Sequence, residues 1–331
     1  MILVTGASGC LGSHLVHALL AADEPVAVLV LPGDPAPALA AVATRLRWHQ
    51  GDILEPHSLV PALAGVSQVY HVAGLASPYE CDRQRMFQVN RDGTRHLLGA
   101  AQAAGVRRFV HVSSIAAVGY PDQLADEGMR YNGAQLGLAY MHSKHAAEQL
   151  AKAMNSPAMA VLIACPAAVI ASQCDLRDGW GKVMLDVARR RLPLVPSGGL
   201  CVVGGADLAQ GLRQLMASGR PGERYILGAC NVSHAQLIDS MARALRVHPP
   251  RWRPSRRLLL ALAWLLRPLD GVARRMRLKL TADVLRVLTQ QVHYRCDKAR
   301  EELGFAPRQG LDEIVDEAAA WLARHLPREQ R

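Results

Sequence analysis

The chain lacks several features that mark membrane-spanning, secreted and disordered proteins. None of its apolar runs approaches the roughly 18 residues of a membrane-spanning helix, and the N-terminus carries no basic leader, so we expect no signal peptide. The seven cysteines form no C-x-x-C pair and no even framework, which favours reduced core thiols in a cytoplasmic protein. With 50% hydrophobic and 20% charged residues among 331, the composition is that of a globular protein.

The histidines also lack the grouping that a metal site needs. His71 and His111 fall within apolar strands, where we expect core histidines with satisfied hydrogen bonds. The remaining candidates are pairs spaced three residues apart, without a third ligand nearby, namely His14 with His17 and His142 with His145. We therefore predict no metal.

The net charge of +10 raises nucleic acid as a partner, but its distribution argues against one. Nine basic residues and one acid lie between Arg251 and Lys279, a net charge of +8, and the rest of the chain is nearly neutral. A charge confined to one short segment indicates a local function, so we predict no nucleic-acid partner.

The opening stretch MILVTGASGCLGSHLVHALL predicts a buried strand, a glycine turn and an amphipathic helix. A helix N-terminus presents unpaired N–H groups, and glycines leave room for a pyrophosphate to approach them. The spacing is G-x-x-G-x-x-G, a variant of the usual G-x-G-x-x-G fingerprint. The turn residues that we predict to bind a dinucleotide are Gly6, Ser8, Gly9, Cys10, Leu11 and Gly12.

The second apolar run, Pro25 to Leu31, predicts a strand whose end selects the cofactor. In a dinucleotide fold an acid there binds the NAD ribose, and an arginine binds the 2′-phosphate of NADP. Leu31 does neither, while Asp34 is a candidate substitute ligand or an ordinary turn residue. We favour NADP, because no carboxylate ends the strand to repel the phosphate, and we leave NAD open.

Strands and helices alternate along the chain, which predicts an α/β fold with a Rossmann-type doubly wound parallel sheet. We place a dinucleotide-binding domain at 1–165 and a smaller, mostly helical substrate lobe at 166–331, with a strand near 224–228 rejoining the first sheet. Further strands are predicted at 46–49, 69–74, 107–114 and 160–170.

Ser114, Tyr140 and Lys144 follow these elements in an order that brings them to one edge of the sheet. Tyr140 and Lys144 are four residues apart and share a helix face. An ammonium about 4 Å from a phenolate, at an effective dielectric constant of about 20, stabilises it by about 4 kcal/mol, or three pKa units. We therefore expect a Tyr140 pKa of roughly 7, which suits proton transfer to a substrate oxygen that Ser114 holds.

With these motifs the chain resembles the extended short-chain dehydrogenase/reductase superfamily over its whole length. The matching pieces are TGASGCLG, GDILEP, HVAG, N-x-x-G-T, VSS, YMHSK, Cys165-Pro166, RYILG and KAREELGFAP. The end of the chain is similar to the branch that holds 3β-hydroxysteroid dehydrogenases, sterol-4α-carboxylate 3-dehydrogenases and 2-alkyl-3-oxoalkanoate reductases. The resemblance implies further cofactor contacts at Asp52, Ile53, Val72, Ala73, Gly74, Asn90, Tyr140, Lys144 and Pro166.

The chain departs from the superfamily pattern where sugar-nucleotide enzymes bind phosphate, since Cys165 replaces the usual arginine. We therefore favour an oxidoreductase that interconverts a hydroxyl and a ketone on a bulky apolar substrate, a sterol or a long-chain 3-oxoacid. A nucleotide-sugar epimerase or dehydratase stays an alternative, with Arg177, Lys182 and 189–191 as possible cations. A non-catalytic dinucleotide-binding protein is a weaker one, and a homodimer is left open.

Residues 251–280 form a basic amphipathic segment around the apolar run Leu258–Leu266. At 1.5 Å per residue the run covers about 13 Å, too short for a hydrocarbon layer of about 30 Å. Basic residues on both sides and Trp264 are typical of a helix in the headgroup plane, so we predict peripheral binding to an anionic membrane at the inner face. The alternative is that the run packs on the substrate lobe.

Overall fold

A seven-stranded parallel sheet forms the centre of the computed structural model, which describes residues 1–177, 179–271 and 281–325. Apart from the exposed edge strand β3 (Arg47–Gln50), the strands are short and largely buried because helices cover both faces, as expected for parallel sheets. In spatial order they are β3 (Arg47–Gln50), β2 (Val26–Val30), β1 (Ile2–Thr5), β4 (Gln68–His71), β5 (Arg108–Val112), β6 (Ala160–Pro166) and β9 (Arg224–Leu227). The predicted Rossmann-type fold is thus confirmed.

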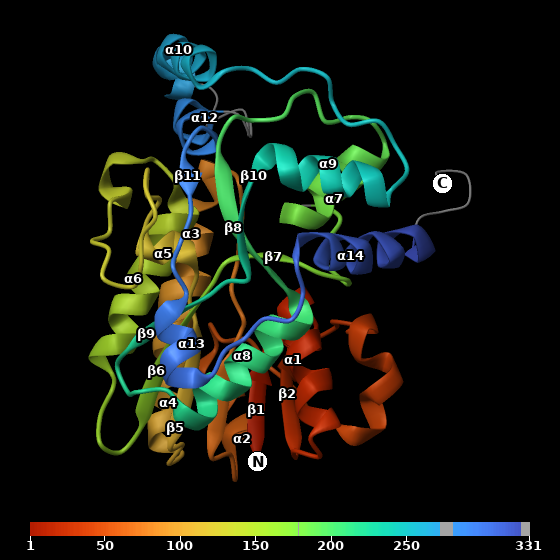
Figure 1. The fold of residues 1–331 in the computed structure, drawn as a ribbon. Helices are drawn as coiled ribbons and strands as arrows, with labels where there is room; N and C mark the ends of the chain where they lie inside the picture. The colour runs from red at the N-terminus through yellow and green to blue at the C-terminus, as the bar shows by residue number, and fades with distance from the viewer. Residues whose placement is uncertain (178, 272–280, 326–331) are drawn as a thin grey trace.

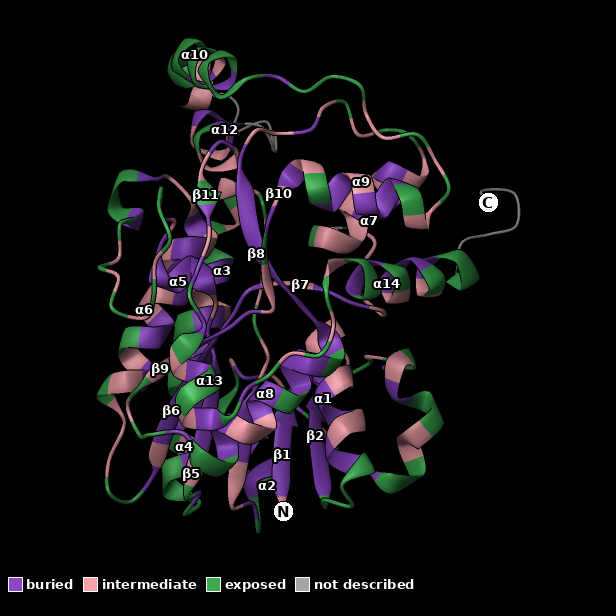
Figure 2. Cartoon of the chain, in the orientation of Figure 1, coloured by how far each residue is buried: buried purple, intermediate pink, exposed green. Residues whose placement is uncertain are grey.

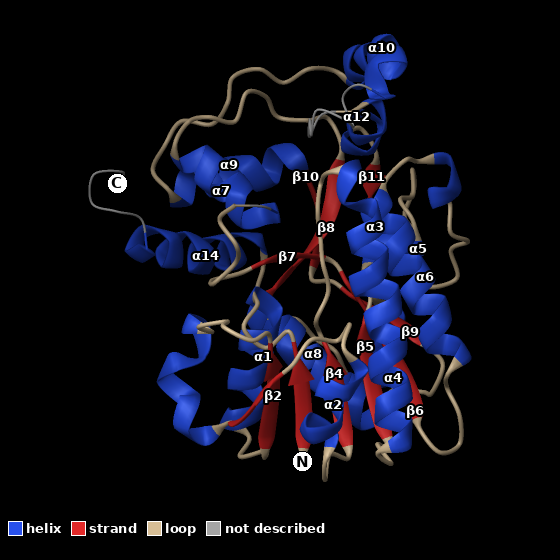
Figure 3. Cartoon of the chain, turned by 180° about the vertical axis from the view of Figure 1, so that it is seen from behind, coloured by secondary structure: helices blue, strands red, loops and turns tan. Residues whose placement is uncertain are grey.

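Two layers of helices enclose this sheet (Figure 1, Figure 3). One face is covered by α1 (Cys10–Ala21), α8 (Gly205–Ser218) and α13 (Asp297–Leu303), and the other by α2 (Pro56–Leu63), α4 (Thr94–Ala103) and α6 (Ala139–Ala153). Short helices α3 (Arg83–Phe87) and α5 (Ile115–Val118) lie at the carboxyl ends of the strands. The structure therefore has the three-layer arrangement that places ligands at this edge.

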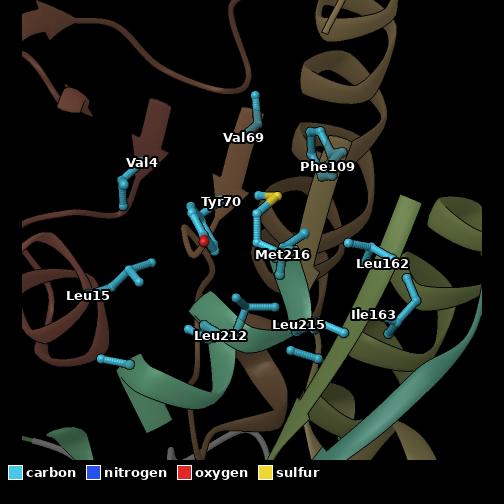
Figure 4. Close-up of a cluster of buried hydrophobic side chains, with 14 of the residues drawn as sticks. Val4, Leu15, Val69, Tyr70, Phe109, Leu162, Ile163, Leu212, Leu215 and Met216 are labelled. Carbon is cyan, nitrogen blue, oxygen red and sulfur yellow. The ribbon is translucent and has the colours of Figure 1, made fainter. Parts of the chain in front are cut away.

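The core between the sheet and the α1–α8 layer is built from aliphatic side chains (Figure 4). Leu15 of α1 and Leu212 of α8 are fully buried in the same cluster as Val4 and Phe109 of the strands. At about 25 cal/mol per Å² of apolar area, burial of this kind stabilises the fold that carries the edge.

A second, four-stranded sheet belongs to the C-terminal lobe, and the sequence analysis did not anticipate it. Its strands are β10 (Cys230–Ser233), β8 (Gly199–Gly204), β11 (Gln291–Val292) and β7 (Ala168–Ile170). The helices of the lobe are α7 (Gly179–Ala188), α9 (His234–Ala244), α10 (Arg256–Leu266), α12 (Ala282–Leu288) and α14 (Leu311–His325).

The strand predicted at 160–170 is two strands in different sheets. Pro166 is the last residue of β6 paired with β9, the Ala167 N–H donates to the Leu227 carbonyl at 3.0 Å, and β7 then pairs with β8 instead. The predicted strand at 69–74 also ends early, at His71, and leaves Val72, Ala73 and Gly74 as extended chain at the sheet edge.

None of the helices within the described ranges has both the length and the apolar character needed to cross a bilayer.

Candidate functional site

The glycine turn between β1 and α1 is held in its conformation by close backbone packing. Gly6 has φ +66°, and a Cβ there would lie 2.6 Å from the backbone nitrogen of Ala73. A Cβ on Gly12 would overlap the Gly6 carbonyl oxygen. Both positions therefore require glycine for the turn itself.

Gly9 differs from Gly6 and Gly12, because it is exposed to solvent and has room for a side chain. Its φ is −75°, it is exposed, and a Cβ there would meet only the Gly6 carbonyl oxygen, at 3.4 Å. Gly9 is also the N-cap of α1, whose first N–H groups have no partner within the helix. The glycine turn thus leaves the N-terminus of α1 open, as the binding of a pyrophosphate requires.

An acid reaches the glycine turn from the loop after β2. The Ser8 hydroxyl donates to Oδ2 of Asp34 at 2.6 Å, and Oδ1 of Asp34 accepts from the Ala36 N–H at 2.9 Å. Leu31, the residue after the strand, is 54% exposed. Our preference for NADP considered only the residue that ends the strand, whereas the turn carries the alternative ligand, Asp34, back to Ser8.

Asp52 and Ile53 follow β3 at the same sheet edge, and their visible contacts are local. Oδ1 of Asp52 accepts from the Leu54 N–H at 2.9 Å. Ile53 is buried against Gly93, where a Cβ would lie 2.6 Å from the Ile53 Cδ1 atom. Their contact with adenine stays a prediction.

A threonine–histidine chain, which the sequence analysis missed, fixes the start of the Val72–Gly74 segment. Nδ1 of His71 lies 2.8 Å from Oγ1 of Thr5, and Nε2 lies 2.8 Å from Oγ1 of Thr94. Burial lowers the pKa of His71 to about 3, so its ring is neutral. The Ala73 N–H also donates to Oγ1 of Thr5, at 3.2 Å.

His71 is therefore a satisfied core histidine, as predicted, but the same expectation is wrong for His111. Neither ring nitrogen of His111 has a hydrogen-bond partner within the described residues, although the side chain is 1% exposed. Its strand is paired on both sides, and the His71 ring, 5.6 Å away, has both nitrogens engaged with Thr5 and Thr94.

Asn90 joins this segment to the helix that carries the tyrosine and lysine. Its Oδ1 accepts from the Leu75 N–H at 2.7 Å, and its Nδ2 donates to the Leu75 carbonyl at 2.8 Å and to Oγ of Ser143 at 2.9 Å. A Cβ on Gly74 would lie 3.2 Å from the Asn90 oxygen and 3.7 Å from Nζ of Lys144. The amide thus sets the distance between the edge and α6.

Ser114 and Tyr140 meet at the edge, as the sequence analysis expected. Ser114 is the N-cap of α5 and accepts from the Ala116 N–H at 3.1 Å. A hydrogen bond joins the Ser114 and Tyr140 side chains. Two acids outside the predicted set hold the start of α6: Glu80 accepts from the Ala139 N–H at 3.0 Å, and Asp283 accepts from the Gly137 N–H at 2.7 Å.

Lys144 lies behind Tyr140, 5% exposed, and donates to the Val112 carbonyl at 2.7 Å. Burial lowers the pKa of Lys144 to about 8. Burial raises the pKa of Tyr140, and only its hydrogen bond with Ser114 opposes that rise. The expected Tyr140 pKa near 7 is therefore wrong, because the Lys144 ammonium donates to the Val112 carbonyl instead.

Replacing Lys144 with methionine is expected to stabilise the fold at pH 7 while impairing activity. The folded-state pKa of about 8 lies below the ordinary lysine value of 10.5, so folding the charged lysine costs up to about 3 kcal/mol at neutral pH. This cost is full below pH 8 and disappears as the pH rises toward the unfolded value. Denaturant unfolding at pH 7 and pH 10 measures it: the advantage of Lys144→Met should shrink with pH, and a destabilised variant at pH 7 would contradict this assignment.

Cys165, in the usual arginine position, is fully buried and contributes no charge. Its thiol donates to Oε2 of Glu148 at 3.5 Å, and Ser113 donates to the same oxygen at 2.8 Å. Lys152 and Arg224 pair with the other oxygen of Glu148 at 3.0 and 3.3 Å. Pro166 is buried at the end of β6, at the same edge as Ser114.

A disulfide joins Cys10, the first residue of α1, to Cys174 in the loop after β7. The expectation of reduced core thiols is therefore wrong for this pair. Cys81 is a free thiol, as expected, but it is exposed and not part of the core. The two positions are 164 residues apart and carry no sequence signal. They meet because the chain leaves β7 and passes over the N-terminus of α1, where His14 contacts the Ser172 carbonyl at 3.2 Å.

Among the described residues, no group of three or more potential ligands could hold a metal ion. Part of the basic segment, with Arg274, Arg275, Arg277 and Lys279, lies outside the described residues.

Comparison with known proteins places this geometry among dinucleotide-dependent enzymes. Residues 2–190 match the model of the NAD dependent epimerase/dehydratase family. Sterol demethylase protein B of Methylococcus capsulatus is 32% identical over 323 residues, covering 96% of this chain and 97% of that protein. The 3 beta-hydroxysteroid dehydrogenase/Delta 5-->4-isomerase of Mycobacterium tuberculosis is 35% identical over 162 residues, 46% of this chain and 42% of that protein. The crystal structure of gox2253 is similar with a TM-score of 0.85 and 30% identity, over 98% of both chains.

Proposed function

Because this chain belongs to the NAD dependent epimerase/dehydratase family, we propose that it is an oxidoreductase that interconverts a secondary hydroxyl and a ketone on a bulky apolar substrate. The observation that carries the proposal is the hydrogen-bonded Ser114–Tyr140 pair, backed by buried Lys144, at the sheet edge. A sterol or a long-chain 3-oxoacid is the substrate class that we favour.

Separate residues bind the dinucleotide and transfer the proton at the substrate oxygen. The open turn at Gly9 and the Asn90-fixed Gly74 segment would hold the dinucleotide, which supplies or accepts the hydride when bound. Tyr140 gives or takes the proton at the substrate oxygen, and Ser114 orients that oxygen by hydrogen bonding. The charge of Lys144 favours the phenolate of Tyr140 when the phenol gives up its proton.

The surroundings of Tyr140 favour an apolar substrate. Tyr140 packs in a small cluster with Ala116, Leu136 and Met141, and Val287 of α12 lies against the same cluster. The relatives named sterol demethylase protein B and 3 beta-hydroxysteroid dehydrogenase/Delta 5-->4-isomerase support a sterol-like skeleton.

A nucleotide-sugar substrate is the second candidate, and the charges oppose it. Binding a diphosphate requires cations, yet Arg177 pairs with Asp175 at 2.9 Å and Lys182 pairs with Asp186. At the position where sugar-nucleotide enzymes often have an arginine, this chain has the buried Cys165. Calorimetric titration with UDP and with a 3-ketosteroid, each with cofactor present, separates the two: we expect binding of the steroid, and binding of UDP alone would contradict the proposal.

We further propose that the cofactor is NAD rather than NADP, because Asp34 is fixed beside the glycine turn. Asp34→Asn keeps the acceptor for the Ala36 N–H and removes the charge. We expect the ratio of the NADP Kd to the NAD Kd to fall at least about tenfold, as removal of one like charge predicts. Cofactor titration of the unmodified protein and of Asp34→Asn measures the ratio. Asp92→Asn, just before α4, is the control. An unchanged ratio would exclude Asp34 as the selector.

A further inference from the structure

Helix α10 extends from the C-terminal lobe at the end of the molecule farthest from β1 (Figure 1, Figure 3). Ser255 caps its first turn by accepting from the Leu258 N–H at 3.3 Å. One face of the helix packs on α12, where Leu259 and Ala263 are buried with Leu285. This contact anchors the helix and leaves its opposite face outward.

The outward face is apolar and exposed (Figure 2). Trp264 is 77% exposed, Leu265 65% and Leu258 50%, and Leu269 just beyond the helix is 56% exposed. Single exposed apolar residues are ordinary, but a continuous strip of them on one helix marks an interaction surface. We call this strip, Leu258, Leu260, Trp264, Leu265 and Leu269, the α10 strip.

Arginines accompany the α10 strip. Arg257 is exposed just before Leu258, and Arg267 is exposed between Leu265 and Leu269. Two acids pair with other arginines of the same segment: Asp122 with Arg256 at 3.6 Å, and Asp239 with Arg253 at 2.6 Å. Asp270 accepts from the Ala282 N–H at 2.9 Å. From Arg251 to Asp270 the chain holds five arginines and one acid, so the surroundings of the strip are cationic.

We propose that the α10 strip docks on the surface of an anionic lipid bilayer. Eleven residues span about 16 Å, roughly half of a hydrocarbon layer, so the helix lies along the surface instead of crossing it. Leucines on one side, arginines beside them and tryptophan at the boundary are the pattern of interfacial helices. The cationic surroundings select an anionic headgroup layer over an apolar protein partner.

Helix α12 connects α10 to the cluster around Tyr140. Helix α12 contacts α10 through Leu285, contacts the Tyr140 cluster through Val287, and holds Gly137 through Asp283. An apolar substrate could therefore pass from the bilayer along α12 without crossing water. This route rests on the proposed function, whereas docking itself does not.

Flotation of the full chain with liposomes of graded phosphatidylglycerol content tests docking without any substrate. The floating fraction should rise with anionic lipid and fall with salt. Arg257→Gln with Arg267→Gln should weaken partitioning about 30-fold, the effect of two basic residues near the surface. Trp264→Ser with Leu265→Ser should also release the protein.

Matched controls distinguish the loss of the α10 strip from general effects of substitution. Val60→Ser changes a residue on α2 that is 65% exposed, the same as Leu265. Arg95→Gln changes a cation on α4 that is exposed, as Arg257 and Arg267 are. Both should float like the unmodified protein, and all variants should retain its unfolding temperature. Protein that stays at the bottom with every lipid overturns the proposal. So does a homodimer that Leu265→Ser dissociates, because a second copy would then cover the strip.

Discussion

Tyr140→Phe is expected to lower turnover by about 10² to 10⁴, the usual contribution of positioned proton transfer. The substitution removes the hydroxyl that bonds Ser114 and leaves the ring in its apolar cluster. The fold and the affinity for the dinucleotide should therefore persist. Steady-state kinetics, cofactor titration and thermal unfolding of the variant measure the three quantities.

Tyr131→Phe is the matched control for this experiment. Tyr131 belongs to the same cluster, but its hydroxyl contacts Nδ1 of His142 at 3.0 Å instead of Ser114. We expect its turnover to stay within a few-fold of that of the unmodified enzyme. Near-normal turnover of Tyr140→Phe would exclude the phenol as the proton carrier.

Gly9→Val is expected to weaken dinucleotide binding by at least about 100-fold while the protein still folds. The backbone of Gly9 has negative φ and its Cβ position is open, so valine causes no clash within the protein. The branched side chain instead fills the approach to the N-terminus of α1, where a phosphate would receive hydrogen bonds from the backbone. Quenching of tryptophan fluorescence by added cofactor measures the affinity.

Two other glycines complete this test. Gly99→Val on α4 also enters open space, away from the turn, and should leave affinity unchanged. Gly12→Val should prevent folding, because its Cβ would overlap the Gly6 carbonyl. Unchanged affinity of Gly9→Val would mean that the turn serves only to pack β1 against α1.

The sheet was predictable from sequence because it depends on local signals. Apolar runs separated by amphipathic helices determine a parallel sheet, and its carboxyl ends share one edge. Ser114 follows β5 as the N-cap of α5, and Tyr140 lies in the first turn of α6 with Lys144 one turn later. This order brings the three residues to one edge, and their catalytic roles stay a prediction.

The features that the sequence analysis missed depend on tertiary contacts between distant residues. The strands β7 and β11 are three and two residues long, too short for any periodic pattern to reveal. The Cys10–Cys174 disulfide and the return of Asp34 to Ser8 are set by loop paths. The pKa of Tyr140 depended on where the Lys144 ammonium points, and its carbonyl partner Val112 lies 32 residues away.

Reduction of a bulky apolar ketone through Tyr140 can be measured in a single assay. The purified chain is incubated with NADH or NADPH and, separately, a 3-ketosteroid, a long-chain 3-oxoacid or a UDP-sugar, while the absorbance of the reduced nicotinamide and the products are followed. We expect oxidation of NADH with the steroid or the oxoacid, and loss of this activity in Tyr140→Phe. Conversion of the UDP-sugar, with both apolar substrates left unchanged, would contradict this expectation.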